Sequence, residues 1–292
     1  MIKKHVVFIV NPRSGVDRKK TITNAIDANL DKDLYTYEIL NTQFAGHGTA
    51  LAKEASRNGA WAVIAVGGDG SVNDAVQGLV GTDTIFGVIP KGSGNGLARN
   101  MRVPLTTEGA IKVISSGKTV NMDIAFANGR PFISNAGVAF DALISKQFAK
   151  SRRRGLLVYG WLVTKGMWQY KPLDWQITID GREIKEHAFM VNVANGQQFG
   201  YNFKIAPMAS YTDGILDVIV IRKFPKILGA GLVYRAMNGT IVSSPYVKHY
   251  SGKEISICNP SLRLMQRDGD AHDCEHKINF TVQQGALKVL VP

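Results

Sequence analysis

The sequence contains little cysteine and no long hydrophobic run. Its two cysteines, Cys258 and Cys274, cannot form the disulfide framework of a small secreted protein, which favours a reducing, cytoplasmic compartment. No segment approaches the roughly 20 apolar residues of a membrane-spanning helix. The apolar run after Lys3 and Lys4 is too short for a signal-peptide core. We therefore expect a cytoplasmic protein that reaches any membrane from the aqueous side.

Acidic residues are scarce relative to basic ones. Lys and Arg total 35 against 23 Asp and Glu, which gives a net charge of +12 and favours anionic partners such as nucleotides or acidic lipid surfaces. No recognisable RNA-binding motif accompanies the aromatic residues, so nucleic acid is not expected as a partner. Two familiar nucleotide signatures are also missing: there is no G-x-x-x-x-G-K-[ST], and no G-x-G-x-x-G follows the first predicted strand.

The most informative stretch runs from Trp61 to Gly78. The apolar run 61–66 predicts a buried strand, Gly67-Gly68-Asp69-Gly70 a tight turn, and Ser71 the N-cap of a helix. Glycines let backbone N–H groups approach a bound phosphate, and a helix N-terminus favours negative charge. The Asp69 carboxylate would repel phosphate on its own but suits a bound Mg²⁺. The stretch therefore predicts a nucleoside-triphosphate loop, with an ordinary strand–helix turn as the alternative.

Strands and helices alternate through residues 1–124, which predicts a mostly parallel sheet with helices on both faces. In such sheets ligands bind beyond the carboxyl ends of the strands. Three predicted strands end in small or polar turns, before Asn11, Gly67 and Gly92. Their convergence on one edge predicts a nucleotide site there. His47 lies at a predicted helix start, where we expect it to pack or cap rather than to contact phosphate.

Residues 125–292 follow a period of two, with hairpin signals at Asn128-Gly129 and Asp180-Gly181. This pattern predicts an antiparallel sandwich or barrel-like domain that begins near Asp123 and packs closely on the first, with a cleft between them. Lys150–Tyr170 interrupts the strands with three arginines and an aromatic helix. This insertion suits anionic lipid headgroups, and a partly buried helix with a solvated basic turn is the alternative.

Acidic residues gather at two turns. Asp213-Gly214-Ile215 could bind a hard cation through oxygen ligands, and Asp268-Gly269-Asp270 ends a strand where side chains can reach a cleft. Both could instead be plain Asp-Gly turns. His272, Asp273, Cys274 and His276 are metal-ligand types, but no second half follows at zinc spacing, so we do not expect a metal there.

Four segments occur together in a characteristic order. They are Asn11-Pro12-x-Ser14-Gly15, Thr42 with Gly46-His47, Gly67–Asp74, and Pro90-x-Gly92-Ser93-Gly94-Asn95. Together they resemble the diacylglycerol kinase catalytic domain and the soluble bacterial lipid kinases built on it. The resemblance continues through Gly137-x-x-Phe140-Asp141, Asp213-Gly214 and Asp268-Gly269-Asp270, and so covers nearly the whole chain. It implies a Rossmann-like nucleotide domain followed by an antiparallel β-sandwich domain.

By this resemblance the protein is an ATP- and Mg²⁺-dependent kinase that phosphorylates a hydroxyl of diacylglycerol or a related lipid at an anionic membrane surface. Asp268 or Asp270 would accept the proton, and Asp69 and Asp123 would belong to the catalytic Mg²⁺ network. Asp213, with the carbonyls of Ser210 and Ile215, would match a structural Mg²⁺ site. The residues assigned to ATP are Asn11, Pro12, Arg13, Ser14, Gly15, Thr42, Gly67, Gly68, Asp69, Gly70, Ser71, Asn73, Asp74, Gly92, Ser93 and Asn95.

Two departures from the family pattern keep alternatives open. Gly96 stands where bacterial diacylglycerol kinases usually have an aspartate, and this form is closer to sphingosine and long-chain-base kinases. Asp270 replaces a glutamate, and its shorter arm slightly favours Asp268 as the base. An NAD kinase and a non-catalytic lipid-binding module with a relic nucleotide loop remain further alternatives. The oligomeric state is also open, with a homodimer as one option.

Overall fold

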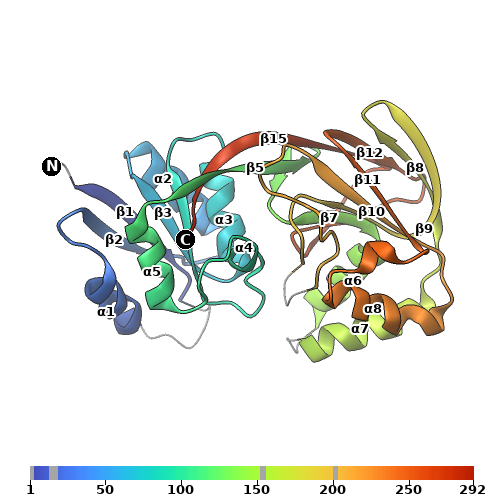
Figure 1. Ribbon diagram of the computed structural model, residues 1–292, viewed down its shortest axis with the longest axis horizontal. Helices are drawn as coiled ribbons and strands as arrows, with labels where there is room; N and C mark the ends of the chain where they lie inside the picture. Colours follow the sequence, from blue (N-terminus) through green and yellow to red (C-terminus); the bar gives the residue numbers. More distant parts are fainter. Residues whose placement is uncertain (1–2, 13–18, 152–155, 200–202) are drawn as a thin grey trace. The chain divides into compact units, whose positions relative to one another are not determined.

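The computed structural model describes residues 3–12, 19–151, 156–199 and 203–292, and the chain forms two compact units (Figure 1). Unit 1 combines Met1–Ile124 with Gln284–Pro292, and unit 2 is Ala125–Gln283. The chain first leaves unit 1 between residues 124 and 125. Its last segment, which the sequence pattern places with the second domain, returns to unit 1 because strand β15 (Lys277–Leu290) pairs with a strand of that unit.

Unit 1 is built on a parallel sheet with the strand order β2-β1-β3-β4-β15. Every residue of the central strand β3 is buried, as expected for a strand covered on both faces. At the β4 edge, Val289 of β15 pairs with Phe86, and both side chains are fully buried. The other strands of this sheet are β1 (Lys4–Val10), β2 (Tyr35–Asn41), β3 (Ala62–Gly67) and β4 (Ile85–Pro90).

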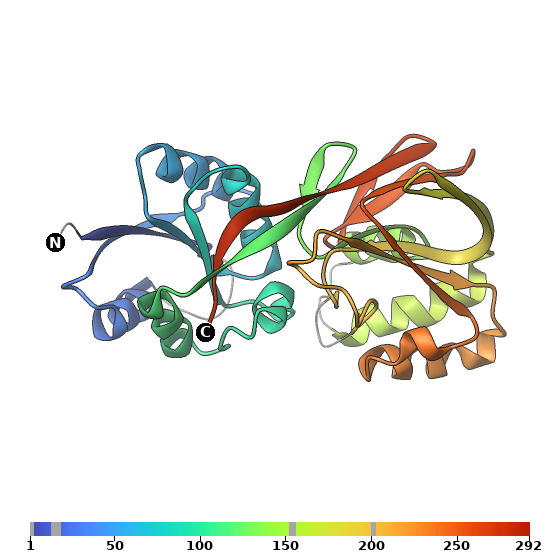
Figure 2. The ribbon, with the colours of Figure 1, turned by 45° about the horizontal axis from the view of Figure 1, so that its top comes forward.

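Helices cover both faces of this sheet, which confirms the predicted α/β class (Figures 1 and 2). Helices α1 and α5 pack together on one face, and α2 and α3 on the other. Gly59 follows the C-cap Asn58 of α2 with φ +79°, the left-handed conformation that favours glycine at this position. The helices are α1 (Lys19–Asn29), α2 (His47–Arg57), α3 (Asp69–Leu79), α4 (Gly96–Asn100) and α5 (Thr107–Ser116).

Helix α3 begins at Asp69, earlier than the predicted start at Ser71. The N-cap residue is the extended Gly68, whose carbonyl accepts hydrogen bonds from the backbone N–H groups of Ser71 and Val72 at 3.0 and 3.1 Å. The first turn therefore closes on a glycine rather than on a serine side chain. This start places the Asp69 carboxylate in the first turn, where the helix dipole favours negative charge.

Unit 2 is an antiparallel β structure entered along β5 (Thr119–Ala127). The predicted hairpins are confirmed: Asn128-Gly129 joins β5 to β6 and Asp180-Gly181 joins β8 to β9, all four residues having positive φ. The long strand β9 pairs with β8 along its first half and with β7 and β10 along its second. The remaining strands are β6 (Arg130–Phe132), β7 (Asn135–Ala139), β8 (Leu173–Ile179), β9 (Arg182–Ala194), β10 (Leu216–Arg222), β11 (Val247–Gly252), β12 (Glu254–Cys258), β13 (Leu264–Arg267) and β14 (Asp270–Asp273).

Two hydrophobic cores stabilise unit 2. The first fills the space between the strands and includes Phe132, Trp175 and Phe280. The second packs helices on the β9–β10 surface and includes Phe140, Phe189 and Leu232. None of the helices in the described ranges is both long and apolar enough to cross a membrane. The helices of this unit are α6 (Phe140–Lys150), α7 (Leu156–Gln169), η1 (Lys226–Leu228), α8 (Gly229–Met237) and η2 (Ile241–Ser243).

The contact between α2 and α3 gives a stability prediction. A Cβ at Gly78 would lie 2.5 Å from the Thr49 carbonyl oxygen and 2.9 Å from the Ala52 Cβ. We expect Gly78→Ala to lower the free energy of unfolding by about 1–3 kcal/mol in urea titrations, because the helices must move apart. Gly70→Ala in the same helix meets no atom within 4 Å. This control should be neutral or stabilising by up to about 1 kcal/mol, and equal losses in both variants would contradict the close helix contact.

Candidate functional site

The carboxyl ends of β2, β1, β3 and β4 lie in register at one edge of the unit 1 sheet. Val10 pairs with Asn41 on one side and with Val66 on the other, and Gly67 pairs with Pro90. The next residues continue this order through backbone hydrogen bonds: Thr42 N–H to Val10 O at 2.9 Å, Asn11 N–H to Val66 O at 3.2 Å, and Lys91 N–H to Gly67 O at 2.8 Å. The structure thus brings together the turns that the sequence places at a single edge.

The two glycine-rich loops touch through their backbones. A Cβ at Gly92 would lie 2.5 Å from the Gly68 Cα, and a Cβ at Gly68 would lie 3.1 Å from the Gly92 Cα. A Cβ at Gly94 would meet the Asp69 carboxylate at 2.6 Å. A side chain at Gly92 would push the two loops apart, so glycine is required there for their close approach, and a Cβ at Gly94 would displace the Asp69 carboxylate.

The Asp69 carboxylate binds the second loop. Its Oδ2 accepts the N–H of Asn95 at 3.0 Å and its Oδ1 accepts the N–H of Gly96 at 2.7 Å. Asn95 itself has φ +52° and closes the loop by exchanging two hydrogen bonds with Gly92. At position 96, where the resembling family usually has a carboxylate, this chain supplies a backbone donor to Asp69.

Other predicted nucleotide residues lie around α2 and α3. The Asp74 carboxylate accepts the Gly46 N–H at 3.1 Å, and its carbonyl accepts the Thr49 hydroxyl, so Asp74 joins the middle of α3 to the start of α2. The Asn73 side chain bonds Gln77 one turn along α3. The His47 ring stacks on Phe44, as expected for a packing role. Arg13, Ser14, Gly15 and Arg152–Arg154 lie outside the described residues.

The predicted metal residues supply oxygen atoms but form no dense cluster. Asp123 is fully buried, and its Oδ1 accepts the Gly285 N–H at 2.7 Å, which joins β5 to β15. Asp213 Oδ1 accepts the Ile215 N–H at 3.1 Å, and the Ser210 hydroxyl faces Thr212. Within the described ranges, no three His, Cys, Asp or Glu side chains gather at metal-binding distance. Single carboxylates of this kind suit Mg²⁺, because a protein-bound Mg²⁺ ion is usually coordinated by one or two carboxylates and otherwise by water molecules and substrate phosphates.

The predicted acidic turn joins β13 to β14, with Asp268 at φ +48° and Gly269 at φ +89°. The Asp268 carboxylate accepts backbone N–H groups from Ile133 and Ser134 at 2.8 and 2.7 Å and a third from Asn135 at 3.3 Å. Burial raises the pKa of Asp268 to about 6, although these donors act in the opposite direction. The Asp270 side chain is exposed and has no hydrogen bond or ion pair to any described residue.

A buried polar cluster behind this turn was not anticipated from the sequence. Asp141 accepts hydrogen bonds from Asn192 at 3.2 Å and Gln266 at 3.3 Å, and Gln266 also accepts the Gly269 N–H at 2.9 Å. The cluster therefore connects α6 and β9 to the acidic turn. Burial raises the pKa of Asp141 to about 7. The available signal was an amide next to apolar residues in two strands: Asn192 in the apolar second half of β9, and Gln266 after Leu264 and Met265 in β13.

Comparisons with known proteins cover almost the whole chain. The family model of the diacylglycerol kinase catalytic domain matches residues 5–127, and that of the YegS C-terminal NAD kinase beta sandwich-like domain matches residues 134–291. A "Probable lipid kinase YegS-like" of Chromohalobacter salexigens is 28% identical over 85% of this chain and 81% of that protein. A "Diacylglycerol kinase" of Mycobacterium tuberculosis is also 28% identical, over 98% of this chain and 95% of that protein.

Solved structures agree with the fold. A crystal structure of a diacylglycerol kinase from Bacillus anthracis str. Sterne superposes with a TM-score of 0.76 at 21% identity, and the match covers 99% of this chain and 97% of that chain. At this identity the likeness establishes the architecture alone. It confirms the predicted parallel-sheet domain followed by an antiparallel β domain.

The raised pKa of Asp141 predicts a pH dependence of stability. The folded protein binds the Asp141 proton more tightly than the unfolded chain, whose carboxyl has a pKa near the ordinary 3.8. This contribution to stability is complete below about pH 4 and is lost as the pH rises through about 7. We expect the free energy of unfolding to fall less between pH 5 and pH 8 in Asp141→Asn than in the wild type. The raised pKa of Asp268 makes the same contribution to the pH dependence of stability in the wild type and in Asp141→Asn. If the free energy of unfolding falls equally with pH in both proteins, the assignment to Asp141 is wrong.

Proposed function

The chain belongs to the family of lipid kinases that join a diacylglycerol kinase catalytic domain to a YegS-type C-terminal domain, and from this we propose that it transfers the γ-phosphoryl group of ATP to a hydroxyl of diacylglycerol or a related lipid. The observation that carries the proposal is the single sheet edge at which the loops after β1, β2, β3 and β4 meet. Positioning and charge neutralisation supply most of the rate enhancement in phosphoryl transfer.

The glycine loops are the proposed phosphate site. Gly68 and Gly92 have no side chains to shield their backbones, and α3 starts at the same place, so its N-terminal dipole favours an anion. Asn11, Thr42 and Ser93 offer further polar groups at this edge. Bound Mg²⁺ would neutralise charge on the phosphates, and Asp69 and Asp123 are the proposed protein ligands. Asp213 with the carbonyls of Ser210 and Ile215 is the proposed second, structural cation site.

For the proton acceptor we propose Asp270 over Asp268. The Asp268 carboxylate is held by three backbone N–H groups, which suits it to fix the turn rather than to receive a proton from substrate. The Asp270 carboxylate is exposed, and its turn is fixed by Asp268 and by Gln266. A base must be accessible and held near its substrate, and the Asp270 carboxylate is exposed while its backbone is held by the pairing of β14 with β13.

An apolar surface on unit 2 supports docking at a membrane. Trp161 and Trp168 of α7 are 60% and 58% exposed, Ile227 of η1 is 82% exposed, and Tyr234 of α8 is 69% exposed. The Lys226 ammonium donates a hydrogen bond to the Trp168 carbonyl, so η1 lies beside the end of α7. Exposed aromatic residues with neighbouring lysines suit the interface of an anionic bilayer.

The test of the function is ³²P transfer from ATP to a total lipid extract, with the labelled product identified by mass spectrometry. Parallel reactions should contain diacylglycerol, a long-chain base or NAD as the acceptor. Label in diacylglycerol or another glycerolipid supports the proposal, whereas label in the long-chain base or in NAD selects one of the alternative kinases. No transfer to any acceptor would favour a binding module that has lost catalysis.

The assignment of the base predicts different outcomes at the two aspartates. Asp270→Asn should lower lipid phosphorylation by about 10²–10⁴-fold and leave the unfolding midpoint unchanged. Asp268→Ala should lower the free energy of unfolding by about 1–3 kcal/mol, because three N–H groups lose their acceptor. Turnover assays and urea titrations measure the two effects. Full turnover of Asp270→Asn would remove this residue from the mechanism.

The docking surface predicts an effect on vesicle binding. Trp168→Ser combined with Ile227→Ser should weaken binding to vesicles rich in phosphatidylglycerol by roughly tenfold or more in sedimentation assays, because two apolar side chains no longer enter the interface. Leu105→Ser is the matched control, since Leu105 is 43% exposed in unit 1. Equal loss in both variants would show that the α7–η1 surface is not the docking face.

A further inference from the structure

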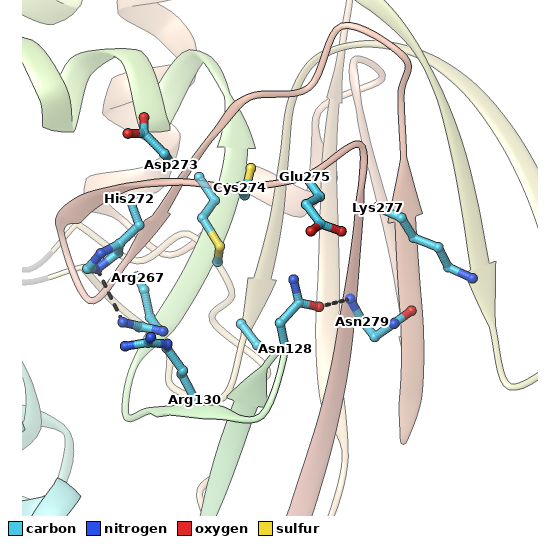
Figure 3. A pocket seen from close by; sticks show the side chains of 11 residues that line it. Asn128, Arg130, Arg267, His272, Asp273, Cys274, Glu275, Lys277 and Asn279 are labelled. Carbon is cyan, nitrogen blue, oxygen red and sulfur yellow. Dashed lines mark hydrogen bonds between the residues drawn. The ribbon is translucent and has the colours of Figure 1, made fainter.

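A pocket of about 680 Å³ lies within unit 2 between the β5–β6 hairpin and the segment that runs from β13 to β15 (Figure 3). Its walls differ in charge from one end to the other. Arg130, Arg267 and His272 gather at one end, with the Asp273 carboxylate nearby, whereas Glu275 and Lys277 lie toward the other end with the amide of Asn128. None of the functions proposed above uses these groups.

The guanidinium groups of Arg130 and Arg267 lie at the same end of the pocket, and they are near enough for the Arg130 charge to act on Arg267 (Figure 3). Arg267 is half-buried, and its Nη2 lies 3.4 Å from Nε2 of His272. Burial and the neighbouring Arg130 charge lower the pKa of Arg267 from its usual range, while Asp268 and Asp270 act against this shift. Arg267 is thus a partly buried charge that faces a second positive charge, and such an arrangement is unfavourable unless an anion offsets it.

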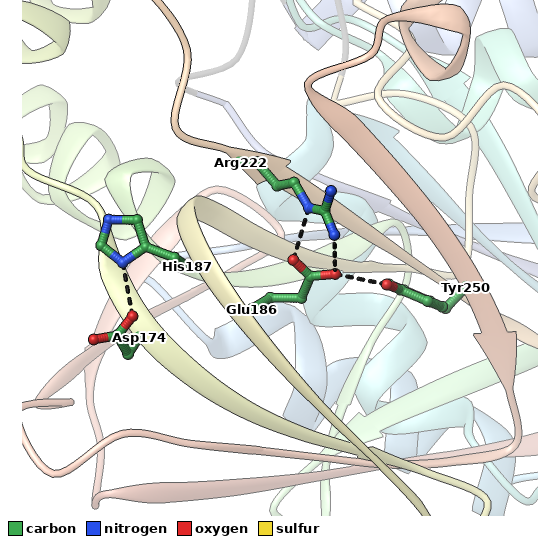
Figure 4. Close-up of polar contacts among 5 residues, drawn as sticks. All are labelled: Asp174, Glu186, His187, Arg222 and Tyr250. Carbon is green, nitrogen blue, oxygen red and sulfur yellow. Dashed lines mark hydrogen bonds and ion pairs between the residues drawn. The ribbon is translucent and has the colours of Figure 1, made fainter.

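Elsewhere in unit 2, the guanidinium group of Arg222 is fully paired with a carboxylate (Figure 4). Arg222 donates Nε and Nη2 to the two oxygens of Glu186 at 2.7 and 2.8 Å, and the pKa of Arg222 is raised. Tyr250 donates a third hydrogen bond to that carboxylate at 2.7 Å. By contrast, no carboxylate in the described ranges lies within ion-pair distance of Arg130 or Arg267.

We propose that this pocket binds a small phosphate ester, with the phosphate at Arg130, Arg267 and His272 and the esterified polyol or amino alcohol toward Glu275 and Asn128. Planar guanidinium groups match the geometry of phosphate oxygens, and two of them can hold one phosphate. At the far end the Glu275 carboxylate suits hydroxyl or ammonium groups. Asn128 offers its Nδ2 donor to a hydroxyl, because its Oδ1 accepts the Asn279 N–H at 2.8 Å. The volume is in the range of small-molecule sites. A free phosphorylated polyol and a phospholipid headgroup share this chemistry.

The test is isothermal titration of the full chain with sn-glycerol 3-phosphate, with glycerol as the uncharged comparison. A second arm uses micelles of short-chain phosphatidylglycerol. We expect one saturable site for at least one phosphate ligand and none for glycerol. Arg130→Gln with Arg267→Gln should weaken binding by tenfold or more. Arg182→Gln with Lys185→Gln removes the same charge from an exposed part of β9 in unit 2 and should leave binding unchanged.

A second measurement locates the ligand independently. Cys274 lines the pocket and Cys258 does not, so a bound phosphate ester should slow alkylation of Cys274 relative to Cys258 in peptide mass spectrometry. Binding of the free ester assigns a soluble ligand, and binding of the micelles alone assigns a lipid headgroup. The proposal is overturned if neither ligand binds. It is also overturned if the double arginine variant and its control lose the same affinity, because binding would then follow net charge alone. Should the double variant unfold, Arg130→Gln alone serves, because Arg130 is exposed and has no partner among the described residues. None of these outcomes depends on turnover.

Discussion

The backbone contact between Gly68 and Gly92 is the constraint on which the candidate site of unit 1 depends. It brings the loops after β3 and β4 so close that a Cβ at Gly92 would lie 2.5 Å from the Gly68 Cα. The Asp69 carboxylate then fixes the arrangement through the N–H groups of Asn95 and Gly96. An acidic residue inside the proposed phosphate site is unfavourable by itself, but here two backbone N–H groups partly offset its charge. Asp69 can therefore order the loops whether or not a metal is bound.

Much of the fold could be predicted from local sequence. Apolar runs located the strands of unit 1, and the Asn128-Gly129 and Asp180-Gly181 turns located two hairpins, because a type I′ turn needs positive φ at both positions. Helix α6 escaped prediction since it follows Ala139 at φ +75° and has no side-chain cap. The start of α3 was misplaced because Gly68 rather than Ser71 closes its first turn.

The site was predictable where it follows from strand order and not where it depends on distant side chains. Parallel pairing of β1 to β4 places Asn11, Thr42, Gly67 and Gly92 at one edge, and alternation of strands and helices was enough to infer it. The different surroundings of the two aspartates in the acidic turn could be seen only in the folded structure. The N–H groups that bind Asp268 come from the β6–β7 segment, which is far away in sequence. Gln266, which holds the same turn, also donates a hydrogen bond to Asp141 in α6.

The return of β15 to unit 1 has a consequence for biogenesis. During translation the ribosome releases β1 to β4 long before Gln284–Pro292, so the nascent first sheet must wait with the β4 edge unpaired until all of unit 2 has been made. An open, apolar strand edge invites pairing with other chains. Because the chain is made from its N-terminus onward, the sheet of unit 1 can be completed only after unit 2 has left the ribosome. This dependence gives a physical reason for the two to be inherited as one polypeptide rather than as separable modules.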